Sequence, residues 1–210
     1  MTPDIRLYPV FPTPILVASQ IINTELLCEV LNYTKSIVTF ESEHNANTLH
    51  SKLFLHNDFL AAPQVFDLLL NAVDHFGQIL LGEKLDWSIA GLWYNRITSG
   101  GAQHLHNHAN SIISGIVYLT DCDGASTTIF HKSNGCQDPI MRNDNDLVEH
   151  NQYTASQWRL ANSKAGDLLL FPSQMLHSVP INKGGERETL AFNALPRSIN
   201  CNGYSMRFFD

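Results

Sequence analysis

Two segments in the first half of the chain carry hydrophobic residues at a helical period. In Asn23–Val38, apolar side chains recur every three or four positions after Asn23 or Thr24, either of which can cap a helix. Ala62–Leu81 repeats this period and ends before Gly82, a typical residue after a helix. The pattern therefore predicts two helices.

The pattern changes from Trp87 onward to short β-prone runs separated by Gly, Asp, Asn and Pro. The predicted strands are Asp86–Ile97, Ala102–His108, Ile112–Thr120, Ser126–His131, Asp167–Phe171, Met175–Ile181, Glu188–Ala194 and Gly203–Phe208. Strands that follow one another without helices between them favour antiparallel pairing. The order predicts an α+β, mainly β fold built on an antiparallel jelly roll.

Three further segments lack a strong period. Ile5–Ser19 contains three prolines, which suits an edge strand or an extended arm. Thr39–Phe59 is rich in Asn, Ser and His and is expected to be a loop with one short strand at most. Asn134–Gln157 is a long polar stretch between predicted strands, and we expect it either to border a functional site or to have no role.

The length of 210 residues fits one large, mainly β domain over residues 1–210. Helical support is expected over about residues 20–82 and the jelly-roll core over about residues 86–210.

The charge and composition of the chain exclude some classes of binding partner. Thirteen Lys and Arg against 20 Asp and Glu give a net charge of −7, which argues against nucleic acid and anionic membranes as partners. The chain shows neither a transmembrane run nor a secretory leader, so we expect a cytoplasmic protein, with a homodimer left open. Four widely spaced cysteines without a CxxC pair indicate free thiols.

A cluster of histidines carries the functional argument. His104, His106 and His108 alternate on a predicted strand, where residues two apart share a face about 6.6 Å apart and residues four apart are separated by about 13 Å. Only neighbours can share a metal ion at about 2.1 Å. The pair is therefore His104 with His106 or His106 with His108, unless all three are polar surface residues.

A later segment offers a further ligand. His177 follows a Gly-Asp turn, an apolar strand and a Phe-Pro pair, the way a distal ligand reaches the metal of a jelly-roll enzyme. Arg187 and Thr189 lie ten and twelve residues further on, and on a strand they face the same way. A guanidinium with a hydroxyl beside it suits a carboxylate. An isolated Arg, by contrast, is more often a solvated surface charge.

These motifs together resemble the 2-oxoglutarate and Fe(II)-dependent oxygenases, and within them a branch of unknown substrate with an HxH motif. The resemblance is carried by Phe11–Pro14, His106–His108 with Ser111–Leu119, Gly166–His177 and Arg187–Asn193. It covers most of the chain and is strongest from Trp93 to Asn193. It implies a double-stranded β-helix with the metal between its two sheets.

The resemblance also implies roles for individual residues. Fe(II) is expected on His106, His108 and His177, with His108 where most of the superfamily has a carboxylate. Asp121 and Asp123 lie too far along the chain to replace that carboxylate. The distal carboxylate of the co-substrate 2-oxoglutarate is expected on Arg187, with help from Thr189.

Other residues near these motifs are expected either to line the pocket or to pack in the hydrophobic core. Tyr118 is a candidate hydrogen-bond partner of 2-oxoglutarate, and Tyr94 and Asn95 are candidate pocket residues. His104 is expected to support a ligand or to face the substrate. Trp93, Phe171 and Phe192 are expected in the core.

The function expected from this resemblance is an Fe(II)- and 2-oxoglutarate-dependent dioxygenase that uses dioxygen to hydroxylate an unknown substrate. The substrate is either a small molecule or a prolyl or other peptide residue. Two alternatives remain open: a three-His cupin-type metalloenzyme without 2-oxoglutarate, and a non-catalytic jelly-roll binding module. Arg187 and Thr189 argue against the cupin, and three grouped His argue against the binding module.

Overall fold

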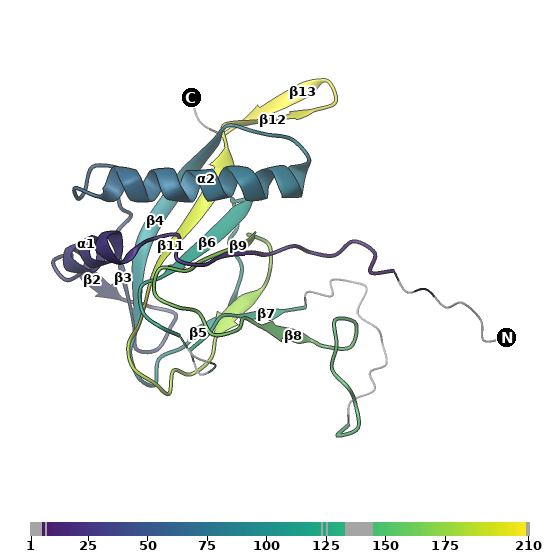
Figure 1. Cartoon of the computed structure of the whole chain (residues 1–210). Helices are drawn as coiled ribbons and strands as arrows, with labels where there is room; N and C mark the ends of the chain where they lie inside the picture. Colours follow the sequence, from purple (N-terminus) through teal and green to yellow (C-terminus); the bar gives the residue numbers. More distant parts are fainter. Residues whose placement is uncertain (1–5, 7, 123, 125, 133–144, 209–210) are drawn as a thin grey trace.

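The computed structural model of the chain describes residues 6, 8–122, 124, 126–132 and 145–208 (Figure 1). Two helices precede most of the strands, as the sequence predicts. The helices are α1 (Thr24–Thr34) and α2 (Ala62–Leu81). The strands are β1 (Leu16–Ala18), β2 (Thr39–Glu41), β3 (Thr48–Ser51), β4 (Trp87–Ile97), β5 (Gln103–His106), β6 (Ile113–Tyr118), β7 (Ile129–His131), β8 (Gln157–Arg159), β9 (Leu168–Pro172), β10 (His177–Val179), β11 (Arg187–Pro196), β12 (Ser198–Cys201) and β13 (Tyr204–Arg207).

The ends of both helices follow from local chemistry. The side chain of Asn23 accepts a hydrogen bond from the Leu26 amide at 2.9 Å and caps α1. This helix stops at Thr34, short of the predicted end, where the hydroxyl and amide of Ser36 both bond the Tyr33 carbonyl. Helix α2 has the predicted bounds and ends at Gly82, whose φ of 73° is left-handed.

The described strands form a seven-stranded sheet, a four-stranded sheet and a separate hairpin. The large sheet has the order β1-β9-β6-β11-β4-β3-β2, the small sheet β5-β10-β7-β8, and β12 pairs with β13. Every pairing between these strands is antiparallel. The predicted mainly β, antiparallel architecture is confirmed.

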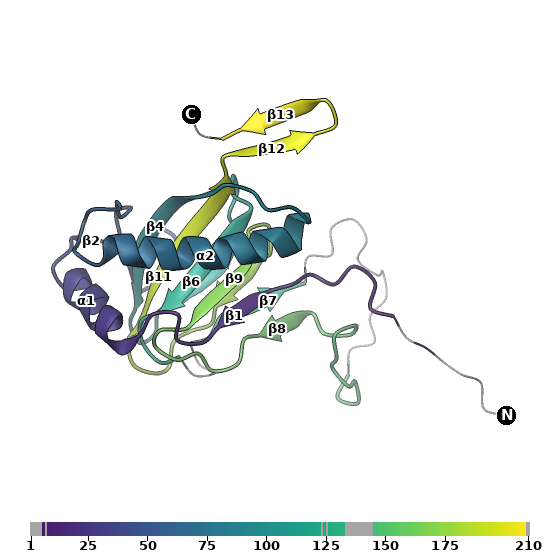
Figure 2. The ribbon, with the colours of Figure 1, turned by 45° about the horizontal axis from the view of Figure 1, so that its top comes forward.

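Alternation along the central strands gives the large sheet two different faces. Leu92 and Tyr94 on β4, with Leu190 and Phe192 on β11, pack toward the helices, and α2 lies across this face (Figure 2). The opposite face meets the small sheet, where the rings of Phe130 and Phe171 have centroids 5.1 Å apart. The main core is therefore between sheet and helices, and a second cluster joins the two sheets.

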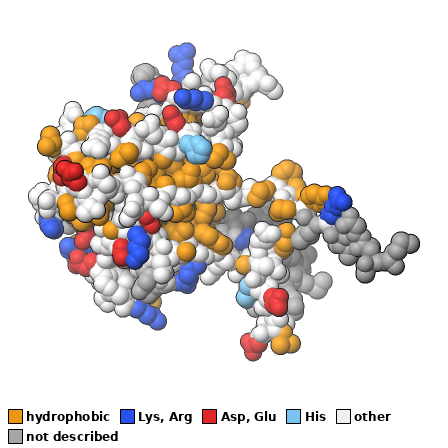
Figure 3. All heavy atoms as spheres, viewed as in Figure 1, with side chains coloured by type: hydrophobic (Ala, Val, Ile, Leu, Met, Phe, Trp, Pro, Cys, Tyr) orange, Lys and Arg blue, Asp and Glu red, His pale blue; other side chains and the backbone are white. Residues whose placement is uncertain are grey.

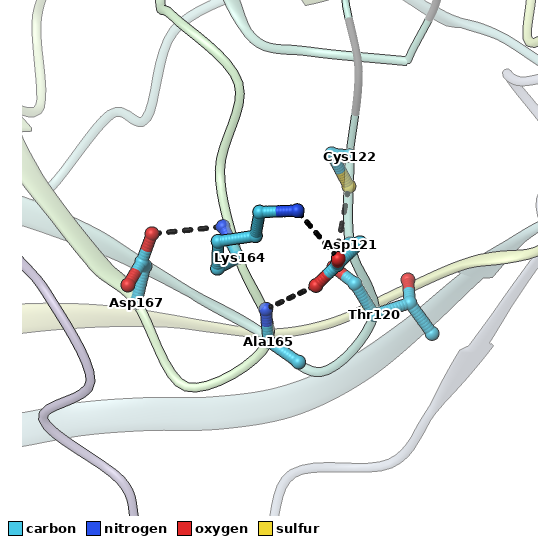
Figure 4. Close-up of polar contacts among 6 residues, drawn as sticks. All are labelled: Thr120, Asp121, Cys122, Lys164, Ala165 and Asp167. Atoms are coloured by element: carbon cyan, nitrogen blue, oxygen red, sulfur yellow. Dashed lines mark hydrogen bonds and ion pairs between the residues drawn. The ribbon is translucent and has the colours of Figure 1, made fainter.

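The Gly-Asp turn before β9 holds three segments together (Figure 4). Asp121 accepts hydrogen bonds from the Ala165 amide at 3.0 Å and from the Lys164 ammonium at 2.8 Å. Asp167 accepts from the amides of Lys164 at 2.8 Å and Gln20 at 2.9 Å. These bonds fix the turn against β6 and against the chain that follows the edge strand β1.

Several predicted boundaries differ from the structure. The polar segment Thr39–Phe59 contains two strands, β2 and β3, without a hydrophobic pattern of their own, because β3 pairs with β4 and β2 pairs with β3. Strands β8 and β12 are not among the predicted strands: β8 has three exposed residues without alternation, and β12 alternates over only four residues. The segment Ala102–His108 is strand only over Gln103–His106. Residues 134–144 of the predicted long loop and Cys136 lie outside the described residues.

The surface carries hydrophobic side chains beside α2 and along the N-terminal arm (Figure 3). Ile79 and Leu81 of α2 and Val10 and Phe11 of the arm are exposed. Cys28, Cys122 and Cys201 are free thiols, as predicted. None of the described helices is long and apolar enough to cross a bilayer.

Candidate metal centre

One cavity of about 470 Å³ lies between the two sheets and contains all three residues of the expected metal site. We call it the His cavity. It is lined by Ser42, Asn45, Thr48, His50, Ser51, Lys52, Leu53, Trp93, Asn95, Gln103, His106, His108, Ile116, His177, Arg187, Thr189 and Ala191. Its walls therefore come from β3, β4, β6 and β11 of the large sheet and from β5 and β10 of the small sheet.

Strand pairing and a loop bring the three imidazoles together. His106 on β5 is directly opposite His177 on β10, and their ring centroids are 4.2 Å apart. His108 follows β5, where its amide donates to the Ser173 carbonyl at 2.9 Å. One ligand nitrogen of each imidazole lies within 4.8 Å of the others. This spacing suits a shared metal ion, and His104 is not part of the group.

Hydrogen bonds fix the orientation of each imidazole. The Nδ1 of His106 lies 2.7 Å from the His104 carbonyl, and that of His177 lies 3.0 Å from the Met175 carbonyl. The Nδ1 of His108 lies 2.6 Å from the Asn193 Oδ1. A carbonyl or amide oxygen only accepts, so each Nδ1 carries the proton and each Nε2 keeps a free electron pair. This is the tautomer that binds a metal through Nε2.

Burial keeps two of these rings neutral. Desolvation, aided by the nearby His106, lowers the pKa of His177 to about 3. Desolvation also lowers the pKa of His108, against the opposing effect of its hydrogen bond to Asn193. Neutral imidazoles are the form that binds a divalent ion.

A buried polar network lies behind His108. The Ser114 hydroxyl is 2.9 Å from the His108 Nδ1 and donates to the Asn193 Oδ1 at 2.9 Å. It also contacts the Ser173 hydroxyl at 2.8 Å, which donates to Ser111 at 3.1 Å. Ser114 and Ser173 are fully buried. The sequence alone assigns none of these residues a role. Asn193 is nevertheless an even number of residues from Arg187 and Thr189 on the same strand, which indicates the same face.

Arg187 is a buried cation at the wall of the same cavity. Only 2% of its surface is exposed. Its Nε donates to the Ser126 carbonyl at 2.9 Å, and its Nη1 donates to the Thr189 hydroxyl at 3.4 Å. Its Nη2 has no hydrogen-bond partner among the described residues. Because a buried unpaired guanidinium is costly, this geometry fits an anionic ligand in the cavity.

The other expected co-substrate residues differ in position. Thr189 and Asn95 line the His cavity and are opposite each other on β11 and β4. Tyr118 does not line it: its hydroxyl bonds Thr128 at 2.8 Å, and its ring lies 5.4 Å from the Arg187 guanidinium carbon. Burial raises the pKa of this phenol. Tyr118 therefore packs against the Arg187 guanidinium and does not line the cavity.

Strand alternation corrects two further expectations. Trp93, expected in the core, lines the cavity, whereas Tyr94, expected at the pocket, is buried on the helix side of the sheet. Phe171 and Phe192 are in the core, as predicted. Neighbouring residues of a strand face opposite sides, so only one of Trp93 and Tyr94 can face the cavity.

The segment 42–53 is the largest omission of the sequence reasoning. Seven of its residues line the cavity, and we call these the 42–53 wall: Ser42, Asn45, Thr48, His50, Ser51, Lys52 and Leu53. Its polar composition gave no sequence signal beyond a loop. The side chain of His104 is exposed, and only its carbonyl acts on the site, through His106.

Two other predictions concern residues away from the cavity. Asp121 pairs with Lys164 and does not line the cavity, whereas Asp123 lies outside the described residues. In the long segment 134–157, residues 150–152 and 155–157 line a different cavity with Phe130, Trp158 and Met175. None of the described residues 145–157 lines the His cavity.

Comparisons with known proteins give the wider context. A family profile described as “Putative 2OG-Fe(II) oxygenase” matches residues 91–193, which contain the three imidazoles and Arg187. No curated protein matches the chain by sequence.

Solved structures share the fold. HygX from Streptomyces hygroscopicus with nickel and 2-oxoglutarate bound superposes with a TM-score of 0.65 at 14% identity, over 88% of this chain and 83% of HygX. A 2OG-Fe(II) oxygenase family oxidoreductase from Burkholderia pseudomallei gives a TM-score of 0.60 at 12% identity, over 86% and 83% of the two chains. The α-ketoglutarate-dependent epimerase SnoN from nogalamycin biosynthesis gives 0.57 at 13% identity, over 91% and 83%. The shared fold is the double-stranded β-helix.

Proposed function

We propose that the chain, whose residues 91–193 match the profile of a 2OG-Fe(II) oxygenase family, hydroxylates a C–H bond of a small molecule, with iron on His106, His108 and His177. The observation that carries this proposal is the buried Arg187 guanidinium, which belongs to a residue of the cavity wall and whose Nη2 has no hydrogen-bond partner among the described residues. A cation there suits the distal carboxylate of 2-oxoglutarate.

Different residues of the cavity bind the metal, bind the co-substrate and exclude water. Iron and 2-oxoglutarate, when bound, supply the oxidation, in which dioxygen, 2-oxoglutarate and the substrate C–H give succinate, carbon dioxide and the alcohol. The imidazoles hold the metal through Nε2, since each Nδ1 is tied to an acceptor. Arg187 binds the co-substrate carboxylate, with the Thr189 hydroxyl beside it. Trp93 and Ile116 supply apolar wall that limits access of water.

The size of the cavity favours a small molecule over a protein segment. About 470 Å³ must hold 2-oxoglutarate as well as the substrate. A single prolyl or other peptide side chain reaching into the cavity is the alternative substrate class. HygX has been solved with hygromycin B bound, which shows that one protein of this fold accepts a small molecule.

Anaerobic titration with Fe(II) and 2-oxoglutarate, followed by visible absorption, tests the proposal. We expect a metal-to-ligand charge-transfer band in the wild type. His106→Ala and His177→Ala should lose stoichiometric iron, because two remaining imidazoles bind iron weakly. His104→Ala is the matched control and should keep most of the iron, since it acts on the site only through its backbone carbonyl. Full metal content after loss of His177 would refute the triad.

Arg187 variants separate the proposal from the cupin alternative. Arg187→Leu should weaken 2-oxoglutarate binding at least about tenfold, because it removes a charge-assisted contact. Arg187→Lys should weaken it less, since it keeps the charge without the planar fork. Iron affinity should be preserved in both variants. Equal 2-oxoglutarate affinity in the wild type and Arg187→Leu would favour a three-His enzyme that does not use this co-substrate.

A further inference from the structure

The His cavity contains no carboxylate among its lining residues, although the chain has 20 Asp and Glu and a net charge of −7. Its charged lining residues are Arg187, which is buried, and Lys52, which is exposed at the cavity margin, and both are cationic. Glu41 and Glu43 flank Ser42 in sequence, but neither is among the described lining residues. The cavity is therefore positive within a negative protein.

The third imidazole increases this positive character. His108 occupies the position at which most of the superfamily supplies a carboxylate, so the protein ligands bring no negative charge to a divalent ion. 2-Oxoglutarate carries two negative charges, and these balance only the two positive charges of the metal ion. The two cationic side chains then remain without a counter-charge from the protein lining. An ion's own charge belongs in any account of such a site.

The two cations are at different ends of the cavity. A row of paired residues crosses the large sheet from Thr189 on β11 to Asn95 on β4 and His50 on β3. With neighbouring strands about 4.8 Å apart, Thr189 and His50 are separated by about 10 Å. Lys52 follows His50 by two residues, at the far end from Arg187. A single 2-oxoglutarate bound to both the metal and Arg187 leaves Lys52 for a second molecule.

Polar residues that line the His cavity together with Lys52 suit a polar substrate. His50 and Gln103 also line the cavity and carry an imidazole and an amide that can hydrogen-bond a substrate. The amide of Asn45 is already engaged, because it accepts from the His104 backbone amide at 2.8 Å and donates to the Ser42 hydroxyl at 3.2 Å. No ion pair joins Lys52 to a carboxylate in the described part of the chain. Its ammonium is a compact charge on a flexible stem, able to follow an anion of variable position.

We propose that the primary substrate is a small organic anion whose negative group pairs with Lys52, opposite the 2-oxoglutarate site at Arg187. This inference rests on the proposed function of the His cavity and adds the substrate class. A carboxylate and a phosphate monoester share the required chemistry, and the experiment distinguishes them.

The test uses the protein loaded anaerobically with Fe(II) and saturating 2-oxoglutarate. The probes are matched pairs of an anion and a neutral compound: N-acetyl-L-proline with N-acetyl-L-prolinamide, 3-phenylpropionate with its amide, and glycerol 3-phosphate with glycerol. A probe beside the metal shifts the charge-transfer band, whereas a probe that displaces 2-oxoglutarate abolishes it. The same probes are then assayed in air for faster 2-oxoglutarate consumption.

We expect the anionic member of at least one pair to shift the band at a concentration about tenfold lower than its neutral partner, a difference of about 1.4 kcal/mol. Lys52→Met keeps the aliphatic stem and should remove this preference, and Lys52→Glu should reverse it. Lys35→Met is the matched control, since Lys35 is exposed at the end of α1 and does not line the cavity, and it should behave as wild type.

The alternative outcomes are distinct. A band that forms with 2-oxoglutarate but shows no preference for anions at millimolar concentration would overturn the substrate class and leave the proposed function in place. A preference for anions that survives in Lys52→Glu would overturn the role of Lys52. Failure of 2-oxoglutarate to bind would overturn both proposals.

Discussion

Asn193 fixes the imidazole of His108, which we propose as a metal ligand in the place of the usual carboxylate. Its Oδ1 lies 2.6 Å from the His108 Nδ1 and also accepts from the buried Ser114 hydroxyl. The amide thus selects the tautomer whose Nε2 is free, as partners of metal-bound imidazoles commonly do. Asn193 is a positioning residue, because it acts on a metal through His108.

Replacing Asn193 by Ala should weaken binding of Fe(II) or Co(II) by about 10- to 100-fold, since the imidazole loses the acceptor that orients it. Asn193→Asp retains an oxygen acceptor and should restore most of the affinity. The measurement is an anaerobic metal titration of the folded variants, with circular dichroism as the control for folding. Wild-type affinity in Asn193→Ala would contradict this role.

Single residues also show which candidates the sequence could bring forward and which it could not. His106, His177 and Arg187 could be selected because their chemistry and spacing are unusual along the chain. His108 could be selected over His104 only through the resemblance, since strand periodicity treats the two alike. Lys52 and Asn193 were missed because a lone Lys and a lone Asn are ordinary surface residues until the fold places them at a cavity.

At the scale of elements, the turn before β9 depends on one glycine. Gly166 has a φ of 93°, and its amide donates to the Tyr118 carbonyl at 2.8 Å. A Cβ at this position would lie 2.4 Å from the Ile22 carbonyl oxygen. The turn therefore requires glycine for its backbone angle and for the close approach of another segment.

Gly166→Ala should destabilise the protein by about 2 kcal/mol or more, from backbone strain together with the contact. For a chain of this size, thermal denaturation should show a fall in Tm of about 5 °C or more. Gly82→Ala is the matched control, because Gly82 also has a positive φ but a Cβ there would meet nothing within 4 Å. An equal loss in both variants would mean that the contact with Ile22 contributes nothing.

Elements with their own hydrophobic pattern were the predictable ones. Helix α2 and strands β4, β6, β9 and β11 carry that pattern and form the core. Strands β2, β3 and β8 are short and contain many polar or exposed residues. Strands β3 and β8 are determined by pairing with β4 and β7, which lie far along the chain, and β2 is added to the sheet through β3. A local reading of the sequence has no access to that pairing.

At the scale of the whole molecule, the proposed metal site takes its residues from both sheets. His106 and His177 belong to the small sheet, whereas His108 is held by Asn193 and Ser114 of the large sheet. The unfolded chain does not present these groups together. A metal ion should therefore stabilise the folded state as a whole.

Ni(II) with 2-oxoglutarate should raise the Tm relative to protein treated with chelator. A ligand at about 100 times its Kd contributes about 2.7 kcal/mol. That corresponds to a rise of about 5–10 °C for a chain of this length. Thermal denaturation with and without metal gives the measurement, and His177→Ala, which lacks one ligand, should show little of the rise. An unchanged Tm in metal-loaded wild type would argue that the three imidazoles do not bind together.

The position of the 42–53 wall at the margin of the large sheet has an evolutionary consequence. Strand β2 ends the sheet, and β3 joins β4 through the register of Thr48, Leu49 and His50 and through the Ser51 hydroxyl, which accepts from the Tyr94 amide at 3.0 Å. The imidazoles and Arg187 come from other strands. Insertions or exchanges in the hairpin can thus diversify the accepted compound without disturbing the oxidative machinery. A chimera carrying the corresponding hairpin of a relative is accordingly a direct route to new selectivity on an unchanged catalytic scaffold.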